Sequence, residues 1–158
     1  MIEIKRTGAI NKPIDKVWKV LYGGFADVGK WVTGVYNSRP GTKEEKLDRV
    51  CTTFTGNLYE KIISRDEKNH TFEVDAKGLP FFVKNFTGRW SLEKVSANTT
   101  KATLTLKIQT KGIIGAIMQI PLKSKLNSGL NETLNDFATY VETGKVSKAK
   151  QKEIDNRK

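Results

Sequence analysis

A helical repeat of apolar residues near the C-terminus constrains the fold of this chain more than any other feature. Apolar residues recur at every third or fourth position, and Gly144 follows the last of them: Leu122, Leu126, Leu130, Leu134, Phe137 and Val141. This spacing predicts one amphipathic helix of about twenty residues, ~30 Å long, with Pro121 at its start or at a kink. An apolar stripe of that length requires an apolar surface to cover.

The segments before this helix alternate between apolar and polar residues, as half-buried strands do. The alternation is clearest over 100–110, where Leu104 and Leu106 share one face and Thr103 and Thr105 share the other. Turn residues separate the segments, which predicts tight antiparallel connections. Strands are predicted at 2–10, 32–38, 47–54, 57–65, 70–76, 83–95 and 100–110.

A helix start signal follows the first predicted strand. Asn11 can cap a helix, Pro13 suits its first turn, and Gly23-Gly24 stops it. The next segment, "ADVGKW", has room for one further turn. The element order predicts an α+β protein in which a curved antiparallel sheet of about seven strands wraps around the long C-terminal helix. Because one helix cannot fill a strongly bent sheet, a cavity is expected between them.

The composition of the 158 residues favours one soluble domain, residues 1–144, followed by a basic tail over 145–158 that we expect to be disordered. The net charge is +11, of which the tail supplies +4. The remainder is scattered without an Arg-rich stripe, so nucleic-acid binding is not expected. With one cysteine and one histidine, neither a disulfide nor a Cys/His zinc site is expected, and no other metal spacing or cofactor motif appears.

The longest apolar stretch, "GIIGAIMQIPL", is about half of the ~20 residues that a membrane span needs. It lies between the last predicted strand and the long helix, where we interpret it as an adaptable gate. No signal-peptide run begins the chain. We therefore expect a cytoplasmic protein without stable membrane insertion, as a monomer or a weak dimer.

Four segments, in order, resemble the SRPBCC (START-like) superfamily, in particular its polyketide cyclase/dehydrase branch. They are "PIDKVWKVLYGGFADVGKWVTGV", "LDRV", "LYEKIISRDEKNHTFEV" and "LPFFVKNFTGRWSL". The resemblance covers roughly residues 2–144 and implies a helix-grip fold whose deep cavity holds hydrophobic or amphipathic small molecules. It does not imply one activity, because this fold hosts binders, transporters, receptors, cyclases and co-chaperones. Asp48, the charged loop 39–46 and the Lys-rich tail depart from the family's pattern.

The candidate ligand-binding residues are aromatic and aliphatic side chains on the predicted inner faces. An ordinary packed core is the alternative interpretation, because core and cavity wall are the same face in this fold. The candidates are Trp31, Tyr36, Phe72, Phe82, Phe86, Trp90, Leu106, Leu126 and Leu130.

Glu60 and Arg49 are the candidate catalytic residues. If a two-residue turn joins their strands, the two side chains share a face and lie near enough to pair. A carboxylate in an apolar cavity can move protons, whereas one paired with arginine stays ionised. The alternative is a structural or surface ion pair. Cys51 is interpreted as a small buried residue, and His70 as an exposed turn residue.

Three functions follow from these observations. The first is a carrier or sensor that binds a hydrophobic small molecule such as a lipid, polyketide or isoprenoid. The second is a cofactor-independent cyclase or dehydratase in which Glu60, with Arg49 or Tyr36, transfers protons. The third is a protein-interaction module of the Hsp90-activator-like type.

Overall fold

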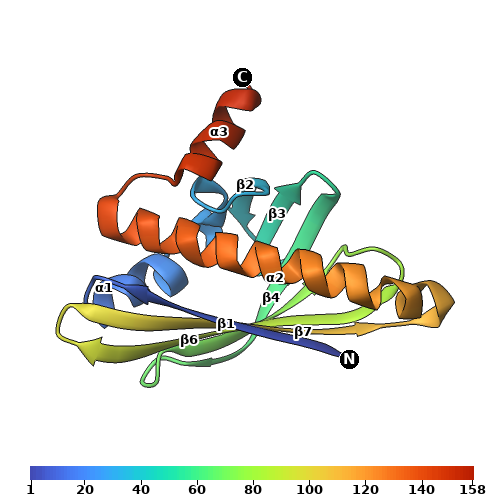
Figure 1. Cartoon of the computed structure of the whole chain (residues 1–158), viewed down its shortest axis with the longest axis horizontal. Helices are drawn as coiled ribbons and strands as arrows, with labels where there is room; N and C mark the ends of the chain where they lie inside the picture. Colours follow the sequence, from blue (N-terminus) through green and yellow to red (C-terminus); the bar gives the residue numbers. More distant parts are fainter.

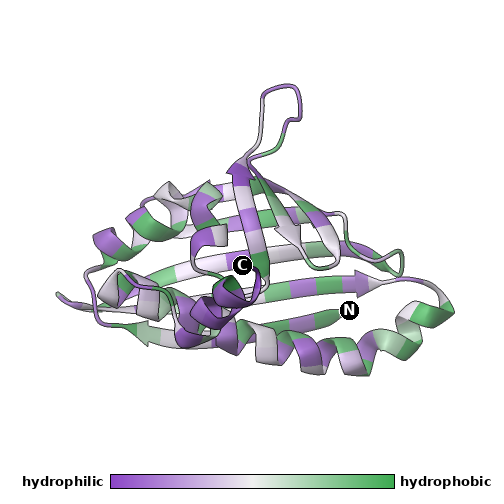
Figure 2. Ribbon diagram, turned by 90° about the horizontal axis from the view of Figure 1, so that it is seen from above, coloured by the Kyte–Doolittle hydropathy of each residue, from purple (hydrophilic) through white to green (hydrophobic).

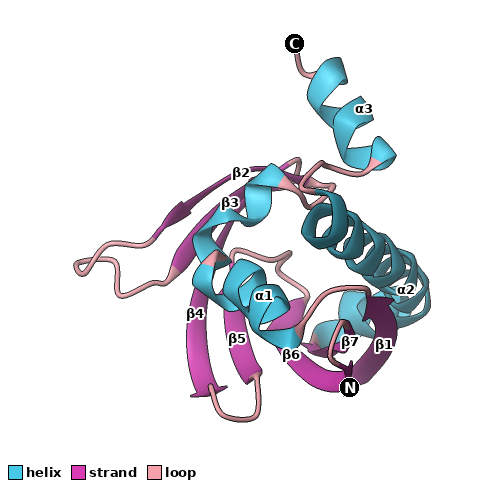
Figure 3. Ribbon diagram, turned by 90° about the vertical axis from the view of Figure 1, so that its left-hand side faces the viewer, coloured by secondary structure: helices cyan, strands magenta, loops and turns pink.

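The computed structural model describes all of residues 1–158, and seven strands in it form one antiparallel sheet. The strand order across the sheet is β1-β7-β6-β5-β4-β3-β2. The strands are β1 (Ile2–Ile10), β2 (Val35–Pro40), β3 (Arg49–Thr53), β4 (Gly56–Asp66), β5 (Thr71–Lys77), β6 (Val83–Ser96) and β7 (Thr99–Thr110). The sheet bends so that its concave side faces the helices, and α2 (Gly112–Thr143) lies along it (Figures 1 and 3). The predicted architecture is confirmed.

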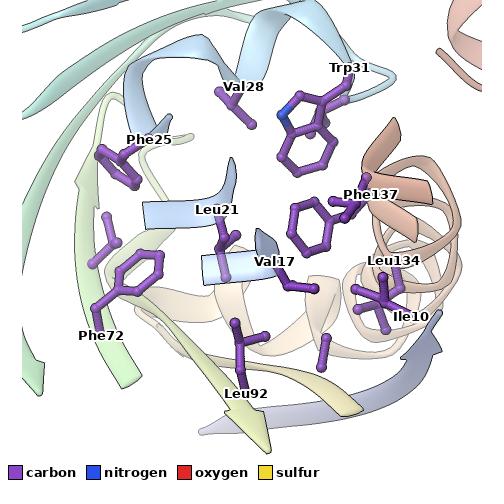
Figure 4. Close-up of a cluster of buried hydrophobic side chains, with 14 of the residues drawn as sticks. Ile10, Val17, Leu21, Phe25, Val28, Trp31, Phe72, Leu92, Leu134 and Phe137 are labelled. Carbon is purple, nitrogen blue, oxygen red and sulfur yellow. The ribbon is translucent and has the colours of Figure 1, made fainter. Parts of the chain in front are cut away.

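Two adjoining apolar clusters hold α2 on the sheet. The smaller one joins the β1 edge of the sheet to the helix, with Ile4 on β1, Leu106 on β7 and Leu130 on α2. The larger one includes Phe72 and Phe137, neither more than 1% exposed. Figure 4 shows side chains from the sheet, α2 and the segment after β1 converging there. The apolar faces that the two periodicities place on the strands and on the helix therefore pack against each other.

The segment between β1 and β2 forms three short helical pieces. They are α1 (Ile14–Trp18), the π-helical turn η1 (Lys19–Gly23) and the 3₁₀ turn η2 (Phe25–Lys30). Pro13 occupies the N-cap position of α1, and no side chain caps it, so the predicted capping role of Asn11 is wrong. The backbone N–H of Asn11 instead donates to Glu142 at 2.8 Å, which ties this turn to the end of α2.

Helix α2 begins at Gly112, so Pro121 lies inside the helix and does not mark its start, which was one of the two predicted roles of this proline. The segment interpreted as a gate is therefore the first part of this helix. A Cβ added at Gly115 would lie 3.0 Å from the Cβ of Thr110, so a larger residue there would push the helix away from β7. Gly144 ends the helix in the left-handed region at φ 71°. None of the helices has an apolar stretch long enough to span a bilayer.

The expectation of a disordered basic tail is wrong, because residues Lys148–Asn156 form a third helix, α3. Ser147 caps it by accepting a hydrogen bond from the Lys150 N–H at 3.1 Å. The helix stands near β2, at the opposite edge of the sheet from β1 (Figure 3). Its Lys150 is completely buried. The composition of the tail predicted disorder, whereas the tertiary contacts of this one lysine order the segment.

Candidate functional site

A cavity of about 310 Å³ lies between the concave face of the sheet and α2. Of its 24 lining residues, 16 are hydrophobic. The floor comes from the inward positions of β3 to β7, and α2 supplies one side wall. The segment after α1 supplies the opposite wall, with Phe25, Val28 and Trp31. Figure 4 shows these three side chains in the buried hydrophobic cluster, together with Phe72 and Phe137.

Most of the predicted site residues line this cavity. Phe72 and Phe86 lie on its floor, and Trp31 faces Phe137 with ring centroids 5.0 Å apart. The predicted residues that the cavity brings together are Trp31, Arg49, Glu60, Phe72, Phe86, Trp90, Leu106, Leu126 and Leu130.

Phe82 does not line the cavity, contrary to the prediction from period-two spacing. It precedes β6, and a bulge between Val83 and Asn85 breaks the alternation that Phe86 and Trp90 follow. The Phe82 carbonyl accepts a hydrogen bond from the Lys111 N–H at 2.8 Å. Phe82 therefore holds the turn before β6 against the start of α2.

Tyr36 also lies outside the cavity lining, which removes it from the predicted proton-transfer set. A bulge between Val35 and Asn37 interrupts the pairing of β2 with β3. The Arg157 guanidinium stacks over the Tyr36 ring, 4.8 Å from its centroid, and donates to the Tyr36 carbonyl at 2.8 Å. The ring is thus a contact surface for the end of α3, which sequence periodicity could not predict.

Arg49 and Glu60 form a two-point ion pair in the cavity wall. A two-residue turn joins β3 to β4, so the two residues lie directly opposite each other. Arg49 Nε donates to Glu60 Oε2 at 2.6 Å, and Nη2 donates to Oε1 at 2.9 Å. Their side chains are only 13% and 12% exposed. Little solvent screening is available to such a pair, which makes it stronger than a surface salt bridge.

Further contacts fix both members of this pair. Arg49 Nη1 donates to the Phe25 carbonyl at 2.8 Å, and the guanidinium lies 3.8 Å from the centroid of the Phe25 ring. The Cys51 thiol donates to Glu60 Oε2 at 3.2 Å. Both carboxylate oxygens of Glu60 are therefore occupied. The pair joins η2, β3 and β4 and presents a fixed polar spot in an otherwise apolar wall.

Cys51 is buried beside this pair. Burial raises the pKa of its thiol to about 12, and the negative charge of Glu60 adds to the increase against the opposing effect of Arg49. A thiol with that pKa is not a nucleophile at neutral pH. The interpretation of Cys51 as a small buried residue is consistent with this geometry.

His70 lies in the turn before β5, as predicted, but its side chain is only 21% exposed. Its ring meets the Trp18 ring edge-on, with centroids 5.3 Å apart. The expectation of an exposed residue is therefore wrong, because α1 packs over this turn. The residue does not line the cavity, so it takes no part in the candidate site.

Glu132 is a lining residue that the sequence-based interpretation missed. It lies on α2 with Gly129 and Thr133, on a face adjacent to the leucine stripe, and it is exposed enough to stand at the rim of the cavity. Its carboxylate forms no salt bridge. Partial burial raises its pKa, and the charges of Asp136 and Glu153 raise it further. In the sequence, Gly129 and Thr133 are four residues apart beside the leucine stripe. These two residues could have indicated that this face of the helix does not pack tightly.

A buried polar cluster fixes the loop over residues 32–35, which closes one end of the cavity. Asp136 on α2 is completely buried and accepts hydrogen bonds from the Ser147 hydroxyl at 2.5 Å and from the Thr33 N–H at 2.8 Å. The Ser147 hydroxyl also caps α3. The cluster thus couples α2, this loop and α3.

Lys150 completes the attachment of α3 to the same loop. Its ammonium donates to the carbonyls of Val32 and Val35 at 2.8 and 2.7 Å and to Glu153 at 3.1 Å. The other oxygen of Glu153 accepts from the Gly34 N–H at 2.6 Å. These bonds compensate the burial of the charge. The cavity wall at Val32 and Val35 is therefore positioned by a helix that lies outside the cavity.

The chain matches one family over nearly its whole length. The model of the family described as "Polyketide cyclase / dehydrase and lipid transport" matches residues 1–142. No curated protein matches the sequence.

Solved structures share the fold at low sequence identity. The Zhui aromatase/cyclase from Streptomyces sp. R1128 is 13% identical, with a TM-score of 0.75, and the alignment covers 92% of this chain and 99% of that one. Protein XoxI from Bacillus cereus is 16% identical, with a TM-score of 0.73 and coverage of 89% and 96%. Norcoclaurine synthase from Thalictrum flavum is 12% identical, with a TM-score of 0.67 and coverage of 87% and 93%. These likenesses confirm the helix-grip fold.

Proposed function

We propose that this chain, which belongs to the polyketide cyclase/dehydrase and lipid transport family, binds a hydrophobic or amphipathic small molecule in the cavity beneath α2. The observation that carries the proposal is the lining of this cavity. The lining encloses about 310 Å³, and 16 of its 24 residues are hydrophobic. A space of that size and composition suits a lipid, polyketide or isoprenoid-like molecule.

The polar groups of the lining limit the chemistry of the ligand. An apolar body fits against Phe72, Phe86 and Leu106, whereas a single hydroxyl or carbonyl group can meet the Arg49–Glu60 pair. Because Arg49 and Glu60 already form hydrogen bonds with each other, the pair contributes more to the orientation of the ligand than to its affinity. A carrier or sensor function therefore fits the geometry better than chemistry at Glu60.

Native mass spectrometry of protein purified without organic solvent tests this proposal. We expect a population heavier by the mass of one small molecule, which solvent extraction releases and a fluorescent fatty-acid probe replaces. Protein that carries no added mass and also fails to bind the probe would overturn the proposal.

A cofactor-independent polyketide cyclase or dehydratase is the second candidate function, and Glu132 favours it. A carboxylate at the cavity rim with a raised pKa and no salt bridge can accept and return a proton. Glu60 remains the other candidate carboxylate, with Arg49 as its partner. This function would be supported if the protein turns over a poly-β-keto substrate and Glu132→Gln abolishes the turnover without weakening substrate binding. Equal turnover by the variant would exclude Glu132 from it.

A further inference from the structure

The first part of α2 is apolar on the side that faces solvent as well as on the side that faces the sheet. Gly115 is buried against β7, and Met118 and Leu122 are half-buried. On the opposite side, Ile113, Ile117 and Ile120 are between 69% and 84% exposed. Their spacing of four and three residues aligns them in one stripe. A helix that only covered the sheet would carry polar residues at these positions.

Phe81 extends this exposed surface. The Lys111 N–H donates to the Phe82 carbonyl at 2.8 Å, so the turn before β6 lies beside the start of α2. Phe81 in that turn is 70% exposed. Figure 2 shows the start of α2 as a hydrophobic turn at one extremity of the molecule. We call this surface the apolar tip, made of Ile113, Ile114, Ile117, Ile120 and Phe81.

The segment around the exposed isoleucine stripe carries charges of one sign. Residues 107–125 contain four lysines and no acidic residue: Lys107, Lys111, Lys123 and Lys125. Lys111 precedes the helix, and Lys123 and Lys125 follow the exposed stripe. The Lys125 ammonium lies 5.2 Å from the ring centroid of Phe54, another exposed aromatic residue. The tip therefore combines exposed apolar side chains with flanking positive charge.

We propose that the apolar tip docks on an anionic lipid bilayer. Exposed isoleucine and phenylalanine side chains can enter the boundary between headgroups and acyl chains, while the lysines contact the headgroup phosphates. A second copy of the chain is disfavoured as the occupant, because a symmetric contact across the isoleucine stripe would bring Lys111 of one copy near Lys123 and Lys125 of the other. The isoleucine stripe runs along the helix, so this part of α2 would lie in the plane of the bilayer surface.

This surface goes beyond the proposed small-molecule binding and does not depend on it. The two features share one helix, since Leu126 and Leu130 line the cavity further along α2 than Ile120. Docking would therefore hold the cavity close to the bilayer. A protein that binds lipid vesicles but no cavity ligand would separate the two proposals.

Vesicle flotation with the full chain tests the docking surface. We expect the protein to float with vesicles of equal parts phosphatidylcholine and phosphatidylglycerol, and not with vesicles of phosphatidylcholine alone. The partition coefficient should fall by roughly 10-fold for each of Ile113→Ser, Ile117→Ser and Ile120→Ser. It should fall by roughly 5-fold for each of Lys123→Gln and Lys125→Gln, and added salt should weaken it.

The matched control is Val95→Ser, which removes a similarly exposed apolar side chain from the far end of β6. It should leave flotation unchanged, and circular dichroism should show that every variant is folded. Wild-type protein that stays unbound with anionic vesicles would overturn the proposal. Equal losses of flotation in Val95→Ser and in the isoleucine variants would also overturn it. The same holds if sedimentation shows a protein dimer that the isoleucine variants abolish.

Discussion

Arg49 on β3 lies directly opposite Glu60 on β4, and two hydrogen bonds of 2.6 and 2.9 Å join them within the cavity wall. Removing one partner leaves a poorly solvated charge. Arg49→Met should therefore lower the free energy of unfolding by about 2–4 kcal/mol. Urea denaturation measures this change.

The double variant Arg49→Met, Glu60→Leu is the control for this prediction, because replacing both charges by apolar groups leaves none unpaired. It should recover most of the lost stability. If the loss of stability in the double variant equals the sum of the losses in the two single variants, the two residues are not coupled.

Leu106 and Lys107 are adjacent residues of β7 on opposite faces of the sheet, which offers a matched pair of substitutions. Leu106→Trp places a larger ring in the cavity, whereas Lys107→Trp places it on the outer face. The first should weaken binding of a fluorescent fatty-acid probe by at least roughly 10-fold, and the second should not. Equal affinities for both variants would place the probe outside the cavity.

Lys150 should contribute more stability than any other lysine of the C-terminal segment. Lys150→Met leaves the carbonyls of Val32 and Val35 without their donor, and we expect a loss of about 2–4 kcal/mol. Lys152→Met, on the exposed side of α3, is the control and should have little effect. Hydrogen exchange at residues 32–36 should speed up in the first variant alone. Unchanged exchange there would mean that α3 does not hold the loop.

Cys51 should resist alkylation in the folded protein. With its pKa raised to about 12 by burial, its thiolate fraction at neutral pH is roughly 10³-fold below that of an exposed cysteine. Mass spectrometry after treatment with iodoacetamide should show modification only when urea unfolds the chain. Rapid labelling of the folded protein would show that Cys51 is accessible to solvent.

Glu132 gives a prediction about pH. Because partial burial and neighbouring charges raise its pKa in the folded state, ionising it costs stability as the pH rises past the ordinary glutamate value. Glu132→Gln should therefore raise the free energy of unfolding near neutral pH, by no more than about 1 kcal/mol since solvent screens this side chain. The difference should vanish well below pH ~4, where the carboxyl is protonated in both states. A loss of stability at neutral pH would show that Glu132 has a favourable partner.

The aromatic face of β6 illustrates how far the sequence-based interpretation reached. Phe86 and Trp90 line the cavity as their spacing predicted, because an uninterrupted strand keeps alternate residues on one face. Phe82 does not, because a bulge intervenes. Bulges depend on pairing with a neighbouring strand, so no pattern within this segment could reveal it.

Local periodicity by itself determined that seven strands precede one long helix, and it determined most of the apolar faces that meet in the core. Those properties depend on residues close together in the sequence. Only the tertiary structure decided that Lys150 is buried and that α3 is ordered, since the partners of Lys150 at Val32 and Val35 lie 118 and 115 residues away. It also decided that Glu132 borders the cavity and that Ile113, Ile117 and Ile120 face solvent, because the rotation of α2 on the sheet is fixed by packing against distant strands.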